Sequence, residues 1–211
     1  MFHFEDSCLR YKKYLIMGDL HIGFETELEK KGYFIPSQTK NMLSKIKKLK
    51  KKSKEIILLG DVKHSIPSAS IQEAIEIPFF LRKLKEIFNE VIIIKGNHDG
   101  NIERMTRIPV AKEFAADNIG FIHGHAKPSK DFMNRIDVLV MSHMHPVFEY
   151  NDSFGKRHSK KCWIIGKWRD KKVIIMPAFN EFFSGSNELI GPFAKEFIRE
   201  EIFLTNLTRI L

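Results

Sequence analysis

The sequence has 211 residues and a formal net charge of +9, from 35 Lys and Arg against 26 Asp and Glu. This length suits one α/β domain with a full core, and we expect a single domain over residues 1–211. No apolar run is long enough to cross a membrane, Glu5 and Asp6 interrupt any signal peptide, and two cysteines are too few for a secreted disulfide framework. We therefore expect a cytoplasmic protein with no membrane partner.

Short apolar runs alternate with helical patterns along the chain, and this order is typical of an α/β fold. Five of the runs are followed at once by polar side chains. They read YLIMGDLH, EIILLGDVKH, EVIIIKGNHD, IGFIHGH and DVLVMSHMH, with strands expected at residues 14–17 and 56–59 in the first two. The polar residues at their ends are Asp19 and His21, Asp61 and His64, Asn97, His98 and Asp99, His123 and His125, and His143 and His145.

Two helices are expected between the first three strands. One covers residues 40–54, where Met42, Leu43, Ile46 and Leu49 mark one helical face by their spacing of three and four. Its eight lysines either form a solvated surface or contact phosphate groups, and the sequence leaves both interpretations open. The other helix covers about residues 70–88 and leads into the third strand.

After His145 the sequence predicts a β-hairpin over residues 162–176, with Trp163 and Trp168 packed in the core. The polar and basic insert at 151–161 is expected to be a loop, either solvated and mobile or in contact with a phosphate backbone. Residues 183–193 are expected to be irregular. The last stretch, 197–211, is expected to be a strand or a helix.

The five polar turns are expected to meet at one edge of the fold. Open α/β sheets bind ligands beyond the carboxyl ends of their strands, and right-handed crossovers bring Asp19, Asp61 and Asn97 to the same edge. Every histidine except His3 and His158 falls in these turns. This clustering predicts a metal site.

The residue types restrict both the metal and the reaction. Cys8 and Cys162 lie far from the five turns, which excludes a cysteine-rich zinc or iron–sulfur site. The carboxylate, amide and imidazole groups are too many for one tetrahedral zinc ion and suit two ions that share a carboxylate. Two ions roughly 3.5–4 Å apart can hold the attacking and leaving oxygens of a displacement at phosphorus. The pattern therefore predicts hydrolysis of a phosphoester.

The ordered series GDLH, GDVKH, GNHD, HGH and SHMH resembles the signature of the calcineurin-like metallophosphoesterases. Its finer details, with the later MPAFN, resemble the small SbcD-related phosphoesterases of archaea and the bacterial ligase-associated DNA-damage-response endonucleases. The resemblance implies a four-layer α/β/β/α sandwich of two mixed sheets flanked by helices. It also implies two divalent metal ions as cofactors, first of all manganese, with iron, zinc and nickel as the other suitable ions.

The resemblance also implies a role for each residue of the series. Asp19, His21, Asp61 and His145 would hold one ion, and Asp61, Asn97, His123 and His143 the other, with Asp61 as the bridge. His98 would contact the scissile phosphate and protonate the leaving oxygen, while Asp99 would orient His98 or its loop. His64 and His125 are expected beside the ligands. Ser142 stands where the family has glycine, so a positive φ there would strain the chain.

The leading hypothesis is a metal-dependent phosphodiesterase that cleaves nucleic acid, a nuclease linked to DNA repair, because the net positive charge favours a polyanionic partner. The alternatives are a phosphodiesterase or phosphatase for small molecules or cyclic nucleotides, and a non-catalytic nucleic-acid-binding scaffold. A metallopeptidase would need a His-Glu-x-x-His helix, which the sequence lacks. The stretch after His145 is short for the capping region and ATPase attachment of SbcD-type nucleases, so no ATPase partner is expected.

Overall fold

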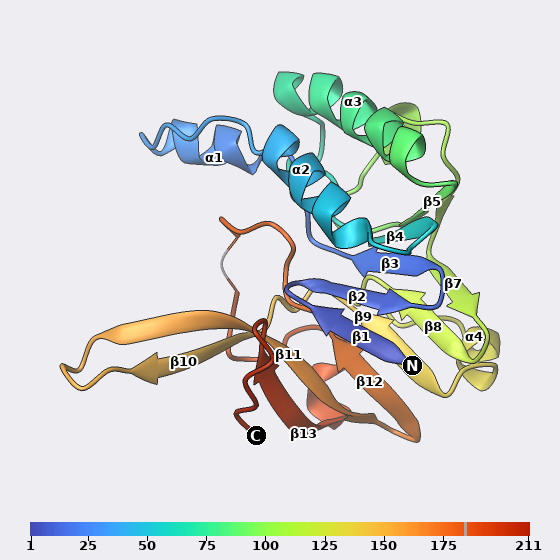
Figure 1. Cartoon of the computed structure of the whole chain (residues 1–211), viewed down its shortest axis with the longest axis vertical. Helices are drawn as coiled ribbons and strands as arrows, with labels where there is room; N and C mark the ends of the chain where they lie inside the picture. Colours follow the sequence, from blue (N-terminus) through green and yellow to red (C-terminus); the bar gives the residue numbers. More distant parts are fainter. Residues whose placement is uncertain (184) are drawn as a thin grey trace.

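The computed structural model describes residues 1–183 and 185–211, and two β-sheets form its centre. Figure 1 shows α2 and α3 on the outer side of one sheet and the shorter α4 beside the other. Both sheets mix parallel and antiparallel strands. The expected sandwich of two mixed sheets flanked by helices is therefore confirmed.

The first sheet has the strand order β1-β2-β3-β4-β5-β6. These strands are Phe2–Glu5, Cys8–Tyr11, Tyr14–Met17, Glu55–Leu59, Glu90–Ile94 and Val110–Ala111. β3, β4 and β5 run parallel, as the crossover rule predicts for strands joined through helices. The strands expected at 14–17 and 56–59 match β3 and β4. The amino-terminal hairpin of β1 and β2 was not predicted.

The second sheet has the order β10-β11-β12-β9-β8-β7, and β13 pairs with β11. In the same order its strands are Val147–Asn151, Arg157–Trp168, Lys171–Ile175, Val138–Met141, Ile119–Ile122 and Glu113–Ala116, with β13 at Phe197–Leu204. β8, β9 and β12 run parallel. The predicted hairpin over 162–176 is confirmed as β11 and β12.

The helices are α1 (Phe24–Lys30), α2 (Thr39–Lys50), α3 (Ile71–Ile87) and α4 (Lys130–Asn134), with 3₁₀ turns η1 (Ile102–Arg104) and η2 (Ala194–Glu196). α3 matches its prediction, because Ser70 and Glu73 form a reciprocal capping box at its start. α2 ends earlier than expected, since Lys51 leaves the helical conformation with a φ of 42°. In the described parts of the chain no helix is both long and apolar enough to span a membrane.

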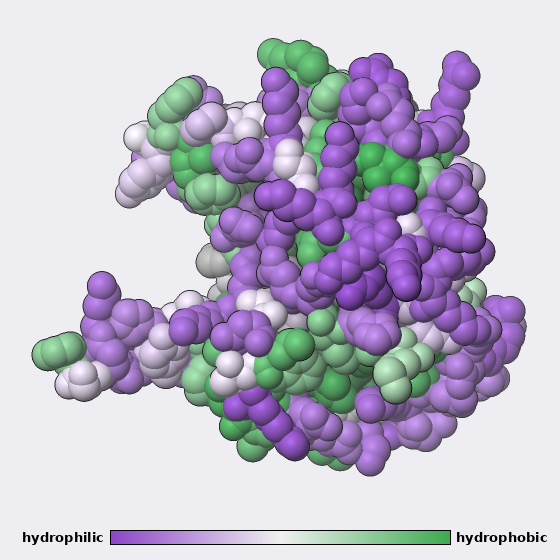
Figure 2. All heavy atoms as spheres, in the orientation of Figure 1, coloured by the Kyte–Doolittle hydropathy of each residue, from purple (hydrophilic) through white to green (hydrophobic). Residues whose placement is uncertain are grey.

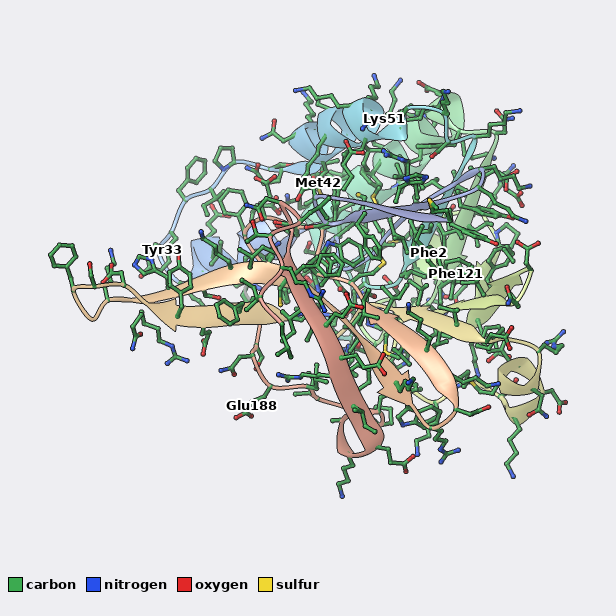
Figure 3. The ribbon with its side chains drawn as sticks, turned by 60° about the horizontal axis from the view of Figure 1, so that its bottom comes forward. Phe2, Tyr33, Met42, Lys51, Phe121 and Glu188 are labelled. Carbon is green, nitrogen blue, oxygen red and sulfur yellow. The ribbon has the colours of Figure 1, made fainter. Side chains whose placement is uncertain are left out.

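Three apolar clusters fill the spaces between the layers. The predicted face of α2 (Met42, Leu43, Ile46 and Leu49) is buried against the first sheet and α3. Between the sheets, Phe121 and Trp163 are fully buried and Phe2 packs beside them; Figure 3 shows Phe2 and Phe121 close together and Lys51 at the surface. Each such large side chain contributes roughly 1.5–3 kcal/mol of burial. The core therefore holds the strand ends in fixed positions.

The insert at 151–161 is not a loop, and that prediction was wrong. β10 and the start of β11 pair antiparallel from Val147 to Lys161 and form a hairpin that stands out from the body (Figure 1); we call residues 147–161 the arm. At its tip, Asp152 Oδ1 accepts hydrogen bonds from the N–H groups of Phe154 and Lys156, at 2.9 and 3.0 Å. This turn closes the hairpin, so polar strands pair where no apolar pattern indicated them.

Two further predictions about the carboxyl-terminal part hold in the structure. Trp163 and Trp168 are 0% and 2% exposed, so both are core residues. The stretch 197–211 forms a strand, β13, followed by a turn. Paired with β11, this strand completes the outer part of the second sheet.

Candidate metal centre

The polar turns after β3, β4 and β5 lie at one edge of the first sheet, and backbone hydrogen bonds fasten them together. Asp19 N–H donates to the carbonyl of Gly60 at 3.1 Å, and His21 N–H donates to the carbonyl of Asp61 at 2.8 Å. His98 N–H donates to Asp61 Oδ1 at 2.9 Å. The expected meeting of these three turns is therefore present.

Five of the expected ligands have a left-handed backbone. Their φ values lie between 42° and 68°, and they are Asp19, His21, Asp61, His143 and His145. Residues other than glycine adopt this conformation at a cost of roughly 1–3 kcal/mol each, and such residues cluster at functional sites. All five residues lie within four residues of the end of a strand, in the turns that follow β3, β4 and β9.

The position of Ser142 does not need a positive φ, so the strain that such a φ would have caused is absent. The positive φ belongs to the next residue, His143, at 68°. Ser142 is fully buried and its hydroxyl donates to the carbonyl of Leu59 at 2.6 Å, with His123 Nδ1 at 3.1 Å. A serine at this position therefore ties the turn after β9 to the end of β4.

Two glycines leave room for the ligands. A Cβ on Gly60 would lie 2.6 Å from His123 Nδ1, and Gly60 has a φ of 77°; a Cβ on Gly96 would lie 2.1 Å from Asp61 Oδ1. Real Cβ atoms do not approach other atoms this closely. Gly60 of the Gly-Asp sequence and Gly96 of the Gly-Asn-His-Asp sequence are therefore needed because no larger side chain fits beside His123 and Asp61.

We expect Gly96→Ala to destabilise the fold and displace Asp61. The added methyl group overlaps a carboxylate oxygen and the Asp61 backbone nitrogen at 2.3 Å, so the turn after β5 must move. Overpacking of this kind costs roughly 1–3 kcal/mol. Thermal unfolding measures the loss, and Gly100→Ala is the control, since a Cβ there would meet only the carbonyl oxygen of Pro67, at an ordinary contact distance of 3.5 Å, and Gly100 has no positive φ. Equal unfolding curves for the Gly96 variant and the parent would contradict this packing.

The first group of expected ligands contains Asp19, His21 and His145, whose ligand atoms lie within 4.8 Å of one another. Asp19 and His21 are fully buried. The Nε2 atoms of His21 and His145 are buried and lack a hydrogen-bond partner among the described residues. Buried imidazole nitrogens normally find a partner, so two that do not, facing a carboxylate, fit a divalent cation.

The second group contains Asp61, His123 and His143, again within 4.8 Å. Asn97 Oδ1 lies 3.1 Å from His123 Nε2, which adds the expected amide to this group. His123 Nδ1 lies 2.8 Å from the carbonyl of Leu59. This contact places a proton on Nδ1 and turns Nε2 towards Asp61 and Asn97. A metal ion that displaced the proton from Nε2 would then be bound by this nitrogen together with the two oxygens.

Asp61 lies between the two groups. Its Oδ2 is 3.2 Å from His123 Nε2 and 3.8 Å from His21 Nε2. A carboxylate in this place can reach both sets of ligands. The geometry is that expected of a bridging ligand.

Burial and the two carboxylates set the protonation of the imidazoles. Burial lowers the pKa of His21 to about 3 and that of His143 to about 4, which keeps both rings in the neutral form that binds metals. At His123 burial also lowers the pKa, but the hydrogen bond and charge of Asp61 outweigh it and raise the pKa to about 9. The carboxylates thus draw positive charge into the centre of the site.

Asp99 orients its loop and does not contact the ring of His98 among the described residues. Its carboxylate is buried and accepts hydrogen bonds from Gly96 N–H at 2.9 Å and Lys63 N–H at 3.0 Å. Of the two roles expected for Asp99, the structure thus favours the orientation of the loop, and it adds a link to the turn after β4. His98 itself is half-buried and its Nδ1 contacts the carbonyl of His64.

His64 and His125 lie beside the ligands, as expected. His64 Nδ1 is 3.2 Å from His21 Nδ1, and His64 Nε2 is 2.7 Å from Glu27 Oε2. If His21 uses Nε2 for a metal, its Nδ1–H donates to His64, and His64 donates in turn to Glu27. His125 is exposed, with its ring 5.3 Å from that of His123.

Glu27 was missed by the sequence analysis, and we expect it to strengthen metal binding. Replacing it by alanine removes the acceptor at the end of the row Glu27–His64–His21, and loss of such a support lowers metal affinity by roughly tenfold. Titration calorimetry with Mn²⁺ measures the effect, and Glu29→Ala on the exposed side of α1 is the control. Equal affinities of the two variants would show that the row has no influence on the ion.

Phe183 and Asn180 were also missed as parts of the site. The Phe183 ring stacks on His21 at a centroid distance of 3.9 Å and meets His145 edge-on at 4.8 Å. Asn180 is buried and its Nδ2 donates to the carbonyl of Leu20 at 2.9 Å. These residues cover and position the first group.

Two cavities reach the centre. One, of about 650 Å³, is lined by Asn97, His123 and His125, among others. The other, of about 320 Å³, is lined by His64, His98 and residues of α1. In Figure 2 the molecule is also hollowed between the part that carries α1 and the arm. The larger cavity therefore opens onto the second group of expected ligands, and the smaller one onto His98.

Comparison with known proteins identifies the family. Residues 12–176 match the model of the calcineurin-like phosphoesterases, and the chain belongs to this family. It is a metallophosphoesterase fold with grouped histidine and aspartate side chains that suit divalent metals. No curated protein matches the sequence.

Solved structures resemble the whole chain at low sequence identity. The nuclease MPE of Pseudomonas putida has 21% identity and a TM-score of 0.66, over 100% of this chain and 99% of that one. The phosphoesterase Yfce of E. coli has 14% identity and a TM-score of 0.47, over 95% and 97%. Vps29 of Chaetomium thermophilum has 17% identity and a TM-score of 0.42, over 86% and 79%. The first of these similarities supports the fold.

Proposed function

We propose that this protein is a two-metal phosphodiesterase that hydrolyses nucleic acid. The ligands would be Asp19, His21, Asp61 and His145 for one ion and Asp61, Asn97, His123 and His143 for the other. The observation that carries the proposal is the convergence of these side chains from separate loops, with two buried imidazole nitrogens left without a hydrogen-bond partner among the described residues. Manganese is the ion we expect first.

Two bound divalent ions would lower the pKa of a water molecule and neutralise charge on the phosphate. The chain's own residues would position the substrate and move a proton. Because His98 Nδ1 is engaged by the carbonyl of His64, Nε2 is the atom left for the phosphate. In its protonated form Nε2 would donate a hydrogen bond to a phosphate oxygen and then a proton to the leaving oxygen.

Nucleic acid is the proposed substrate for two reasons. The net charge of +9 favours a polyanion, and the structure most similar among those compared above is named a nuclease. We further propose that the reaction belongs to DNA repair in the cytoplasm, where the free thiols of Cys8 and Cys162 stay reduced. An ATPase partner is not part of the proposal.

A substrate comparison with Mn²⁺ tests the function. We expect hydrolysis of bis(p-nitrophenyl) phosphate, a small diester, and of single-stranded or duplex DNA, with little release of phosphate from p-nitrophenyl phosphate. Chelation by EDTA should abolish both activities, and added Mn²⁺ should restore them. Activity on the monoester alone would support a phosphatase instead, and binding of DNA without hydrolysis of any ester would support a scaffold.

A further inference from the structure

The large cavity at the second group of expected ligands has a neighbouring cavity. The first, of about 650 Å³, begins at Asn97 and His123. The next, of about 530 Å³, lies beside α4 and Trp168, and the two share Lys127 and Pro128 in their walls. The two cavities therefore adjoin at Lys127 and Pro128, between the expected metal site and α4.

This surface is strongly basic. Its cationic side chains are Lys95, Lys112, Lys127, Lys130, Arg169 and Lys171. The acidic ones are Glu113 and Asp170, and Glu113 is engaged by the N–H and hydroxyl of Ser129 at 3.0 and 2.7 Å. We call the cationic set the basic track.

Half of the track is paired with carboxylates: Lys95 with Glu103, Arg169 with Glu196 and Lys171 with Asp170. The other three lysines, Lys112, Lys127 and Lys130, are exposed and have no acidic partner within 4.0 Å among the described residues. The positive charges of these lysines repel one another. Binding of an anionic ligand would relieve this repulsion, so the surface favours an anion. Because the three lysines come from the walls of two adjoining cavities, they could contact several phosphate groups of one strand.

Two lysines on and after the lysine-rich helix α2 are paired with carboxylates, and the cavity at its end lies away from the expected metal ligands. Lys45 pairs with Asp6 and Glu181, at 2.7 and 2.8 Å, and Lys51 pairs with Glu5 at 2.5 Å. The cavity at its end, lined by Lys51 and Lys52 among others, contains none of the expected metal ligands. We therefore look for further phosphate contacts beside the expected metal site, and the comparison of variants below tests both surfaces.

We propose that a nucleic-acid strand bound at the metal centre continues along the basic track, with its phosphates on Lys112, Lys127 and Lys130. This inference rests on the proposed function and deepens it, because it assigns the residues that hold the substrate beyond the reacting phosphate. A small diester occupies only the metal centre. The track therefore affects polymeric substrates alone.

The test compares two triple variants that remove the same charge. The track variant carries Lys112→Gln, Lys127→Gln and Lys130→Gln, and the control carries Lys47→Gln, Lys48→Gln and Lys52→Gln on and after α2. For each, kcat/KM with Mn²⁺ is measured on a single-stranded oligonucleotide over a range of salt concentrations and on bis(p-nitrophenyl) phosphate. All six side chains are exposed, so we expect both variants to fold, and circular dichroism checks this.

We expect the track variant to lose roughly tenfold or more in kcat/KM on the oligonucleotide at low salt. The slope of log(kcat/KM) against log[salt] should become shallower by about 2, because each phosphate contact on a single strand contributes about 0.7. The small diester should be cleaved at the parental rate by both variants. An unchanged slope for the track variant, or an equal loss in the α2 variant, would overturn the inference.

Failure of the proposed function gives a different result. If the parent hydrolyses neither substrate, fluorescence anisotropy of the labelled oligonucleotide with the same three proteins still tests the track. Weaker binding by the track variant alone would support it. Equal binding by all three proteins would refute it.

Discussion

Replacing His98 by alanine is expected to lower the rate of diester hydrolysis by roughly two to four orders of magnitude, the usual contribution of a general acid. The ring is half-buried above the centre, stacked on His64 and edge-on to His21 at centroid distances of 5.5 and 4.9 Å. The substitution removes no expected metal ligand, because His98 is not a ligand of either ion in the proposal. The variant should therefore bind Mn²⁺ with the stoichiometry of the parent.

The comparison needs both a rate and a binding measurement. Steady-state hydrolysis of bis(p-nitrophenyl) phosphate gives the first, and titration calorimetry gives the second. His3→Ala is the matched control, since His3 is exposed on β1 and away from the polar turns. If the His98 variant hydrolysed the diester at the parental rate, the His98 ring would have no role in catalysis.

Replacing Asp61 by asparagine is expected to have the largest effect of any single change. The amide keeps the shape that accepts the His98 N–H but removes the charge that lies between the two histidine groups. Two-metal chemistry contributes several kcal/mol of charge stabilisation, and each 1.36 kcal/mol corresponds to tenfold in rate. The rate should thus fall by about 10³-fold or more, with loss of at least one bound Mn²⁺.

Calorimetric stoichiometry and the rate together test this result. Asp117→Asn is the control, because Asp117 is an exposed carboxylate paired with Lys12 at 2.8 Å on the far edge of the sheet. An Asp61 variant that binds two ions with parental affinity would show that Asp61 does not bridge them.

The ends of the strands could be predicted because short stretches of the sequence determine where each strand stops. An apolar run fixes a strand such as β3 or β4, and parallel pairing then places the residues after it, including Asp19 and Asp61, at one edge. The start of α3 is equally local, since Ser70 and Glu73 lie three residues apart and cap it. These short-range patterns were sufficient to place Asp19 and Asp61 at the same edge of the sheet.

Other parts depend on contacts between distant residues and left no pattern in the sequence. The arm forms because polar strands pair across a turn, as Tyr150 with His158. Glu27 reaches His64 only because the fold brings α1 beside the turn after β4. Phe183 lies in an irregular stretch and meets His21 from far along the chain. The sequence also did not show that the positive φ of this turn belongs to His143 and not to Ser142.

Crystals soaked in Mn²⁺ and measured near the manganese absorption edge provide the most direct test. We predict two anomalous peaks roughly 3.5–4 Å apart, one among Asp19, His21 and His145 and one among Asn97, His123 and His143, with Asp61 between them. A single peak would contradict the two-metal centre. So would a peak held by His21, His64 and His98, the other set of imidazoles close enough to share an ion.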